Sequence, residues 1–131
     1  MKKPALHGGL RHLALYSTNL EASTRFYTDI LGLEIVWQPD ADNVYLSSGS
    51  DNFALHRAPA GFKADGDQRL DHLGFFLRER ADVDEWHQYM QEQHVPIKAA
   101  PKDHRDGTRS FYCADPDGNV VQMIYIKLEQ D

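Results

Sequence analysis

Residues 110–126, Ser-Phe-Tyr-Cys-Ala-Asp-Pro-Asp-Gly-Asn-Val-Val-Gln-Met-Ile-Tyr-Ile, contain the pattern that decides the fold. Two apolar-aromatic runs flank a turn sequence in which Pro116 fixes φ and Gly118 can take a positive φ, so we expect a β-hairpin. In the second strand, alternation places Gln122 among aliphatic residues on one face. Because burying an unsatisfied amide costs about 1–3 kcal/mol, Gln122 requires a specific partner.

Length and charge limit the class of protein. The chain has 131 residues, of which 41% are hydrophobic, and this is enough for a single domain, residues 1–131. Its 14 Lys and Arg residues are scattered among 20 Asp and Glu residues, so no basic stripe is available for a nucleic-acid backbone. There is no signal-peptide pattern and no run of about 18 apolar residues. We therefore expect a cytoplasmic protein without a nucleic-acid or membrane partner.

The predicted elements occur twice in the same order. The first set comprises a strand at 10–17, a helix at 20–31, and strands at 33–37, 44–47 and 52–57. After a linker at 58–68, the second set comprises a strand at 70–77, a helix from 82 that Pro96 ends, a short strand around residue 97, a loop at 101–107 and the hairpin. His12 and His72 occupy matched positions sixty residues apart. We infer an internal duplication of β-α-β-β-β, with modules at 8–58 and 69–128.

Alternation divides the first strand of each module into two faces. Leu13 and Leu73 lie on the apolar face, which we expect a helix to cover. His12 and His72 lie on the opposite face, as does Gln122 in the last strand. If the two sheets curl together, these three side chains converge.

At these residues the sequence resembles the vicinal oxygen chelate superfamily, which contains glyoxalase I, extradiol dioxygenases, and fosfomycin- and bleomycin-resistance proteins. The resemblance is carried by residues 10–15, 20–33, 71–75, 107–112 and 115–119. It implies an α+β fold in which two βαβββ modules form a cup-shaped mixed sheet with helices on the convex face. It also implies a homodimer and a divalent metal ion held at the positions of His12, His72 and Gln122.

The chain departs from the family pattern at two positions. Gln122 stands where Glu is usual, and Ala54 stands where glyoxalase-like and epimerase-like members carry a further ligand. Two imidazoles and an amide oxygen suit Fe(II) or Mn(II), which we favour, and also Ni(II) or Zn(II), but we expect weaker retention without a carboxylate. The missing carboxylates also remove the evident proton-abstracting base, which favours extradiol-dioxygenase-like over lactoylglutathione-lyase-like chemistry.

Two further residues are candidate catalytic groups. Tyr112 stands where dioxygenase-like members carry a tyrosine near the substrate, although it could be an ordinary strand aromatic. His56 shares a face with Ala54 and could be a metal ligand, contact the substrate or be a surface residue at the strand end. His104 and Arg105 lie on a polar loop that could close over the cup or remain solvated.

These candidate site residues are consistent with two alternative functions. In the first, the protein is a metal-dependent enzyme acting on a small substrate with two adjacent oxygens. In the second, His12, His72 and Gln122 form a hydrogen-bonded cluster without metal. The cup then binds an aromatic or drug-like molecule, as bleomycin-resistance proteins do.

Overall fold

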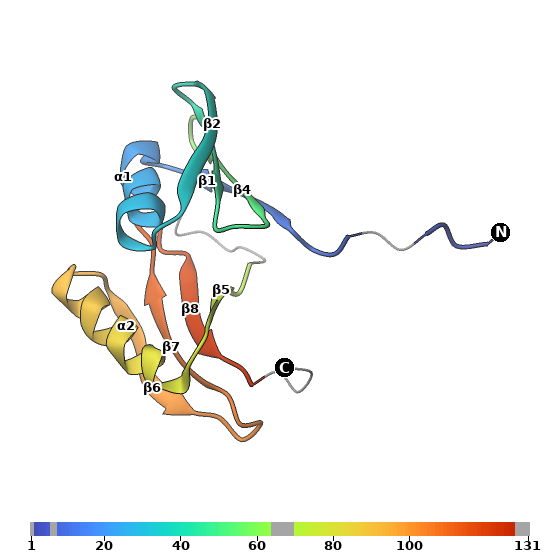
Figure 1. Ribbon diagram of the computed structural model, residues 1–131. Helices are drawn as coiled ribbons and strands as arrows, with labels where there is room; N and C mark the ends of the chain where they lie inside the picture. The colour runs from blue at the N-terminus through green and yellow to red at the C-terminus, as the bar shows by residue number, and fades with distance from the viewer. Residues whose placement is uncertain (1, 6–7, 64–69, 128–131) are drawn as a thin grey trace. The chain divides into compact units, whose positions relative to one another are not determined.

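The computed structural model describes residues 2–5, 8–63 and 70–127, and the chain divides into two compact units, Met1–Phe62 and Lys63–Asp131. Each unit holds one four-stranded mixed sheet with helical structure (Figure 1). The α+β class and the two βαβββ modules are therefore confirmed. Residues 69 and 128, the bounds predicted for the second module, lie outside the described residues. None of the helices in the described ranges has the length and apolar character needed to cross a membrane.

The first unit builds its sheet in the order β1-β4-β3-β2, with β1 parallel to β4 and the other pairs antiparallel. Its elements are β1 (His12–Ser17), α1 (Leu20–Arg25), the π-helical turn η1 (Phe26–Ile30), β2 (Glu34–Asp40), β3 (Asn43–Ser47) and β4 (Asn52–Arg57). Tyr27 is fully buried, and its ring packs edge-on against Phe53 of β4 with ring centroids 4.7 Å apart. This contact joins the helical segment to the sheet.

The second unit repeats this arrangement with the strand order β5-β8-β7-β6. Its elements are β5 (Leu73–Leu77), α2 (Arg80–Glu92), β6 (Ile97–Asp103), β7 (Arg109–Ala114) and β8 (Val120–Tyr125). Val83 and Met90 of α2 are fully buried, as are Phe111, Val121 and Met123 of the sheet. The helix therefore covers the apolar face, as the alternation of the strands predicts.

The hairpin between β7 and β8 forms as predicted. Gly118 has φ +84°, and the Asp115 carboxylate accepts hydrogen bonds from the backbone N–H groups of Asp117 and Asn119 over 2.9 and 2.8 Å. These bonds close the turn and set the register that pairs Tyr112 with Gln122.

Several predicted boundaries were wrong. β2 continues through residues 38–40, beyond the strand predicted at 33–37, and β6 continues through 101–103, expected as a loop. Both are edge strands whose register shifts twice against the neighbouring strand, and edge strands with bulges accommodate Pro39 and Pro101. α2 begins at Arg80, before the expected start at Asp82, and β5 begins at Leu73, so His72 lies directly before the strand.

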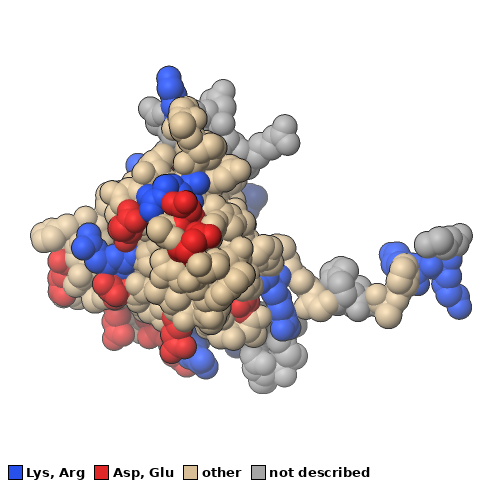
Figure 2. All heavy atoms as spheres, turned by 90° about the horizontal axis from the view of Figure 1, so that it is seen from above, with Lys and Arg blue, Asp and Glu red and all other residues tan. Residues whose placement is uncertain are grey.

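The charged surface has no single sign on the face drawn in Figure 2. Lys and Arg groups lie beside Asp and Glu groups there. Two ion-pair networks are built on arginines: Arg57 pairs with Glu21 and Asp42, and Arg109 pairs with Asp84 and Asp103.

Candidate metal and substrate site

The faces predicted for the first strands are confirmed within each unit. In β1, His12 and Tyr16 are exposed, whereas Leu13 and Leu15 are half-buried. In the second unit Gly74 is exposed and Leu73 is half-buried. Both histidines therefore lie on, or directly before, the sheet face that the helix leaves open.

His12 and His72 both direct Nδ1 to an oxygen acceptor. His12 Nδ1 lies 3.0 Å from the backbone oxygen of Asn52, and His72 Nδ1 lies 2.6 Å from Asp71 Oδ2. A carbonyl oxygen and an ionised carboxylate can only accept, so Nδ1 carries the hydrogen in both rings. Each neutral ring then has an unprotonated Nε2. Metal-binding histidines commonly show this arrangement, with Nδ1–H directed to a carboxylate or a carbonyl.

The partners of the Gln122 amide lie on the neighbouring strand β7. Gln122 Nε2 donates to Ser110 Oγ and to the Tyr112 hydroxyl, each over 3.0 Å. Gln122 is 8% exposed and Ser110 is 1% exposed, so these bonds satisfy both N–H groups of a buried amide. The predicted need for a partner is met without a histidine.

The amide oxygen of Gln122 is directed toward the opposite neighbour, β5. Gly74 pairs with Gln122, and a Cβ placed on Gly74 would lie 3.8 Å from Gln122 Oε1. The glycine therefore leaves open the space beside this oxygen. His72 lies two residues before Gly74, so strands about 4.8 Å apart with a rise of about 3.3 Å per residue put the Cα atoms of His72 and Gln122 on the order of 8 Å apart. Oε1 thus points toward the strand that follows His72.

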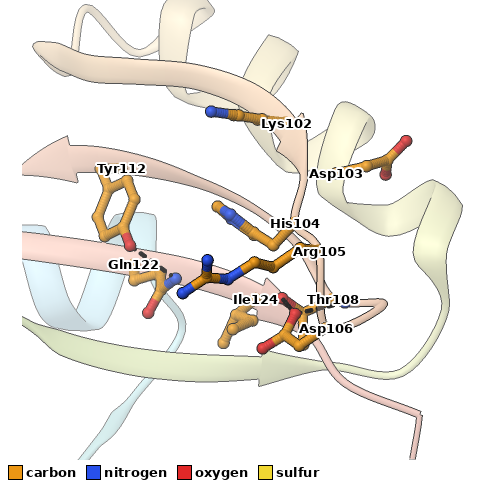
Figure 3. Close-up of a pocket in the computed structure, with 9 residues that line it drawn as sticks. All are labelled: Lys102, Asp103, His104, Arg105, Asp106, Thr108, Tyr112, Gln122 and Ile124. Atoms are coloured by element: carbon orange, nitrogen blue, oxygen red, sulfur yellow. Dashed lines mark hydrogen bonds between the residues drawn. The ribbon is translucent and has the colours of Figure 1, made fainter.

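A pocket of about 580 Å³ opens over this part of the second unit (Figure 3). Its lining residues are Lys102, Asp103, His104, Arg105, Asp106, Thr108, Tyr112, Gln122 and Ile124. In Figure 3 the Arg105 side chain reaches across the pocket toward Gln122, whereas the Asp103 carboxylate points away from it.

The acidic side chains of the pocket are already engaged. Asp103 pairs with Arg80 over 2.8 Å and with Arg109 over 3.1 Å. Asp106 accepts from the hydroxyl and the backbone N–H of Thr108, and these bonds hold the pKa of that carboxyl below its usual value. Neither carboxylate is a basic group free to remove a substrate proton.

The basic side chains of the pocket are differently placed. Among the residues that the structure describes, Lys102 and Arg105 have no ion pair. Two cations without an ion pair therefore line the pocket, which suits a ligand that carries negative charge.

His56 lies on the same open face of the first unit as His12 but far along the sheet. His12 pairs with Asn52 and Tyr16 with His56, so the two histidines are separated by four residues of strand, about 13 Å. His56 Nδ1 lies 2.6 Å from Asn43 Oδ1. Ala54 pairs with Ala14 as Gln122 pairs with Gly74, so Ala54 occupies the position equivalent to Gln122 and supplies no ligand atom.

The structure brings together three of the five predicted site residues. His72, Tyr112 and Gln122 lie in the second unit, where the rings of His72 and Tyr112 meet edge-on with centroids 5.5 Å apart. His12 and His56 lie in the first unit, so the shared site with His12 stays a prediction. Among the described residues, no group of three His, Cys, Asp or Glu side chains could hold a metal ion, so the predicted ligand set depends on Gln122.

Comparison with known proteins identifies the family. Residues 9–123 match the Glyoxalase/Bleomycin resistance protein/Dioxygenase superfamily. The chain belongs to this superfamily. The match covers both modules and includes His12, His72, Tyr112 and Gln122.

Relatives within the superfamily have different activities. The chain is 26% identical over 122 residues to the metallothiol transferase FosB of Staphylococcus haemolyticus, covering 92% of this chain and 86% of FosB. It is 28% identical over 119 residues to biphenyl-2,3-diol 1,2-dioxygenase 3 of Rhodococcus globerulus, covering 87% of this chain and 61% of the dioxygenase. The crystal structure of lactoylglutathione lyase from Agrobacterium tumefaciens aligns with a TM-score of 0.73 and 28% identity, over 95% of this chain and 96% of the lyase.

The superfamily thus includes metal-dependent enzymes that act on small molecules. The donor atoms of this chain fit such an ion, because an unprotonated imidazole nitrogen and an amide oxygen both bind divalent transition metals.

Sequence reasoning missed Ser110 as part of the site and left the roles of His104 and Arg105 open. The position of Ser110 could have been inferred, because it lies two residues before Tyr112 and therefore on the same face of the hairpin.

Proposed function

We propose that the chain is a metal-dependent enzyme that acts on a small substrate with two adjacent oxygen atoms. His12, His72 and Gln122 are the proposed ligands of a divalent ion, with Fe(II) or Mn(II) favoured. The observation that carries this proposal is that both histidines direct Nδ1 to an oxygen acceptor, which leaves Nε2 of the neutral ring available to an ion. The direction of Gln122 Oε1 toward β5 supports it.

The bound ion would supply a Lewis acid and a template for the substrate oxygens. The residues of the chain have the remaining roles. The Tyr112 hydroxyl accepts from Gln122, so its own proton is available to a substrate oxygen. Arg105 and Lys102 would bind a negatively charged substituent of the substrate.

The reaction we favour is ring cleavage of the extradiol-dioxygenase type. An isomerase or lyase of the lactoylglutathione-lyase type needs a base that removes a proton, and Asp103 and Asp106 are engaged by Arg80, Arg109 and Thr108. The Rhodococcus relative is named for a substrate with two adjacent ring oxygens, which agrees with this preference.

A second candidate is a small-molecule binding protein without metal. The observation in its favour is that Ser110 and Tyr112 satisfy both N–H groups of Gln122 within the protein. Such a protein would use the same pocket to hold an anionic or aromatic molecule.

Metal analysis tests the proposal and separates the two candidates. Chain purified without chelator, then loaded anaerobically with Fe(II) or with Mn(II), should retain about one equivalent of metal. The double variant His12→Ala, His72→Ala should retain none. The double variant His87→Ala, His94→Ala, which changes two histidines outside the proposed site, should retain the metal. If the wild-type chain retains no metal after loading, the metal-dependent enzyme is excluded and the binding protein is favoured.

Activity is then measured on catechols. The Fe(II)-loaded chain should convert biphenyl-2,3-diol or a simpler catechol to a ring-opened product, which is followed by its absorbance and by oxygen uptake. If the chain retains metal but takes up no oxygen with any catechol, the proposed metal site stands and the dioxygenase reaction is excluded. We also expect a homodimer, which light scattering would detect.

A further inference from the structure

A chain of hydrogen bonds joins His104, on the loop after β6, to Gln122 in β8. His104 Nε2 lies 2.8 Å from Ser110 Oγ, and Gln122 Nε2 donates to the same oxygen over 3.0 Å. Gln122 Nε2 also donates to the Tyr112 hydroxyl over 3.0 Å. Ser110 is 1% exposed and Gln122 is 8% exposed, so water does not readily replace these partners.

The two hydroxyl groups alone do not decide which end of the amide faces β5. The oxygen of a glutamine side chain only accepts and its NH₂ only donates, while the two ends have nearly equal size. If the Gln122 amide rotated by half a turn, Oε1 would face the hydroxyls of Ser110 and Tyr112, and each hydroxyl could donate to it. The NH₂ group would then face β5.

His104 distinguishes these two arrangements through Ser110. When His104 Nε2 is unprotonated, it accepts the hydroxyl proton of Ser110, and Ser110 Oγ then offers only lone pairs to Gln122. The amide must present its NH₂ to Ser110, so Oε1 faces β5. A hydrogen on Nε2 would remove this constraint, because Ser110 Oγ would accept from His104 and could then donate its own proton to Oε1.

We propose that His104, acting through Ser110, is a positioning residue that keeps the amide oxygen of Gln122 directed toward β5 and His72. The inference rests on the proposed function in one respect, that Oε1 is a metal ligand. The orientation of the amide is a property of the protein alone and can be measured without metal.

A double-mutant cycle tests the consequence for metal binding. We expect His104→Phe to weaken Mn(II) binding about two- to threefold in isothermal titration calorimetry, because an amide with two about equally populated orientations presents its oxygen to β5 only about half of the time. Ser110→Ala should have the same effect. In a Gln122→Glu background both ends of the side chain are oxygen, so His104→Phe should leave the Mn(II) affinity unchanged.

The matched control is His87→Phe. It makes the same replacement in the same unit, but on the side of the sheet that α2 covers. There the centroid of the His87 ring lies 5.3 Å from the centroid of the buried Phe111 ring. His87→Phe should leave the Mn(II) affinity unchanged, and thermal melts followed by circular dichroism check that each variant is folded. An equal loss of affinity for His104→Phe in both backgrounds would overturn the proposal, because His104 would then act through charge or folding.

Side-chain amide NMR distinguishes failure of this inference from failure of the proposed function. In the metal-free chain, the Gln122 NH₂ protons should exchange slowly with water and show contacts to Ser110 and Tyr112, and His104→Phe should speed the exchange and weaken these contacts. A chain with this NH₂ pattern that binds no Mn(II) would refute the metal site and retain the positioning role. Unchanged NH₂ signals in His104→Phe would refute the positioning role, whatever the metal result.

Discussion

The Tyr112 hydroxyl accepts a hydrogen bond from the Gln122 amide over 3.0 Å, and the two residues stand directly opposite each other in the β7–β8 pair. This bond joins a proposed catalytic group to a proposed metal ligand within one hairpin. The register of the hairpin therefore sets the position of both side chains, and substitutions at either one separate their roles.

Replacing Tyr112 by Phe should lower kcat much more than metal affinity. The ring that meets His72 at 5.5 Å is kept, but the proton donor is lost, and such a group typically contributes about 100-fold or more to a rate. Gln122 loses one acceptor, so we expect only a few-fold loss of Mn(II) affinity. Steady-state kinetics and calorimetry on the same preparations measure the two effects. Parallel losses of kcat and affinity would instead assign Tyr112 to holding Gln122.

Gln122→Glu should tighten metal binding by about tenfold or more, because an ionised carboxylate adds a negative charge to the ligand set. The hydroxyls of Ser110 and Tyr112 can each donate to the new carboxylate, so the fold should be retained. Gln122→Leu, which lacks a donor atom, should abolish binding. Calorimetric titration with Mn(II) measures both variants, and equal affinities for all three proteins would mean that residue 122 is not a ligand.

Arg105→Ala should raise KM for a carboxylate-bearing catechol about tenfold, the effect of losing one charge-assisted hydrogen bond, with little change in kcat. KM for a neutral catechol should hardly change. Arg105→Lys should recover part of the loss, and Arg25→Ala, an exposed arginine of the first unit, is the control. Equal effects on charged and neutral catechols would show that Arg105 does not bind the substituent.

The Cys113 thiol should react with Ellman's reagent only when the protein unfolds. Burial raises its pKa to about 12, so almost no thiolate is present at pH 8, and the thiol is fully buried as expected for a small apolar residue. Rapid labelling of the folded chain would contradict this assignment.

The same shift predicts a loss of stability at alkaline pH. Above about pH 9 the unfolded state loses the thiol proton while the folded state keeps it, so the contribution of Cys113 to the free energy of unfolding decreases as the pH rises toward 12. Urea denaturation of the wild type and of Cys113→Ala at several pH values measures the difference between the two proteins, which cancels the titration of Tyr and Lys. A difference that does not change over this range would refute the linkage.

Local sequence determined the elements and their faces. The turn chemistry of residues 115–119 and the alternation of residues 120–125 define the hairpin without reference to the rest of the chain, because both depend on backbone preferences and a two-residue period. The repeat of sixty residues likewise identified the two modules and the equivalence of His12 and His72. These features are short in range or repeated, so they can be read from the chain itself.

Only the tertiary structure decided which side chains meet. The bonds of Gln122 to Ser110 and Tyr112, the contact of Ser110 with His104, and the approach of Arg105 across the pocket depend on the register of strands and on the path of a loop. The extension of β2 and β6 past their prolines depends on their place at the sheet edges. Register and edge position are set by packing between distant segments, which the pattern within any one segment does not contain.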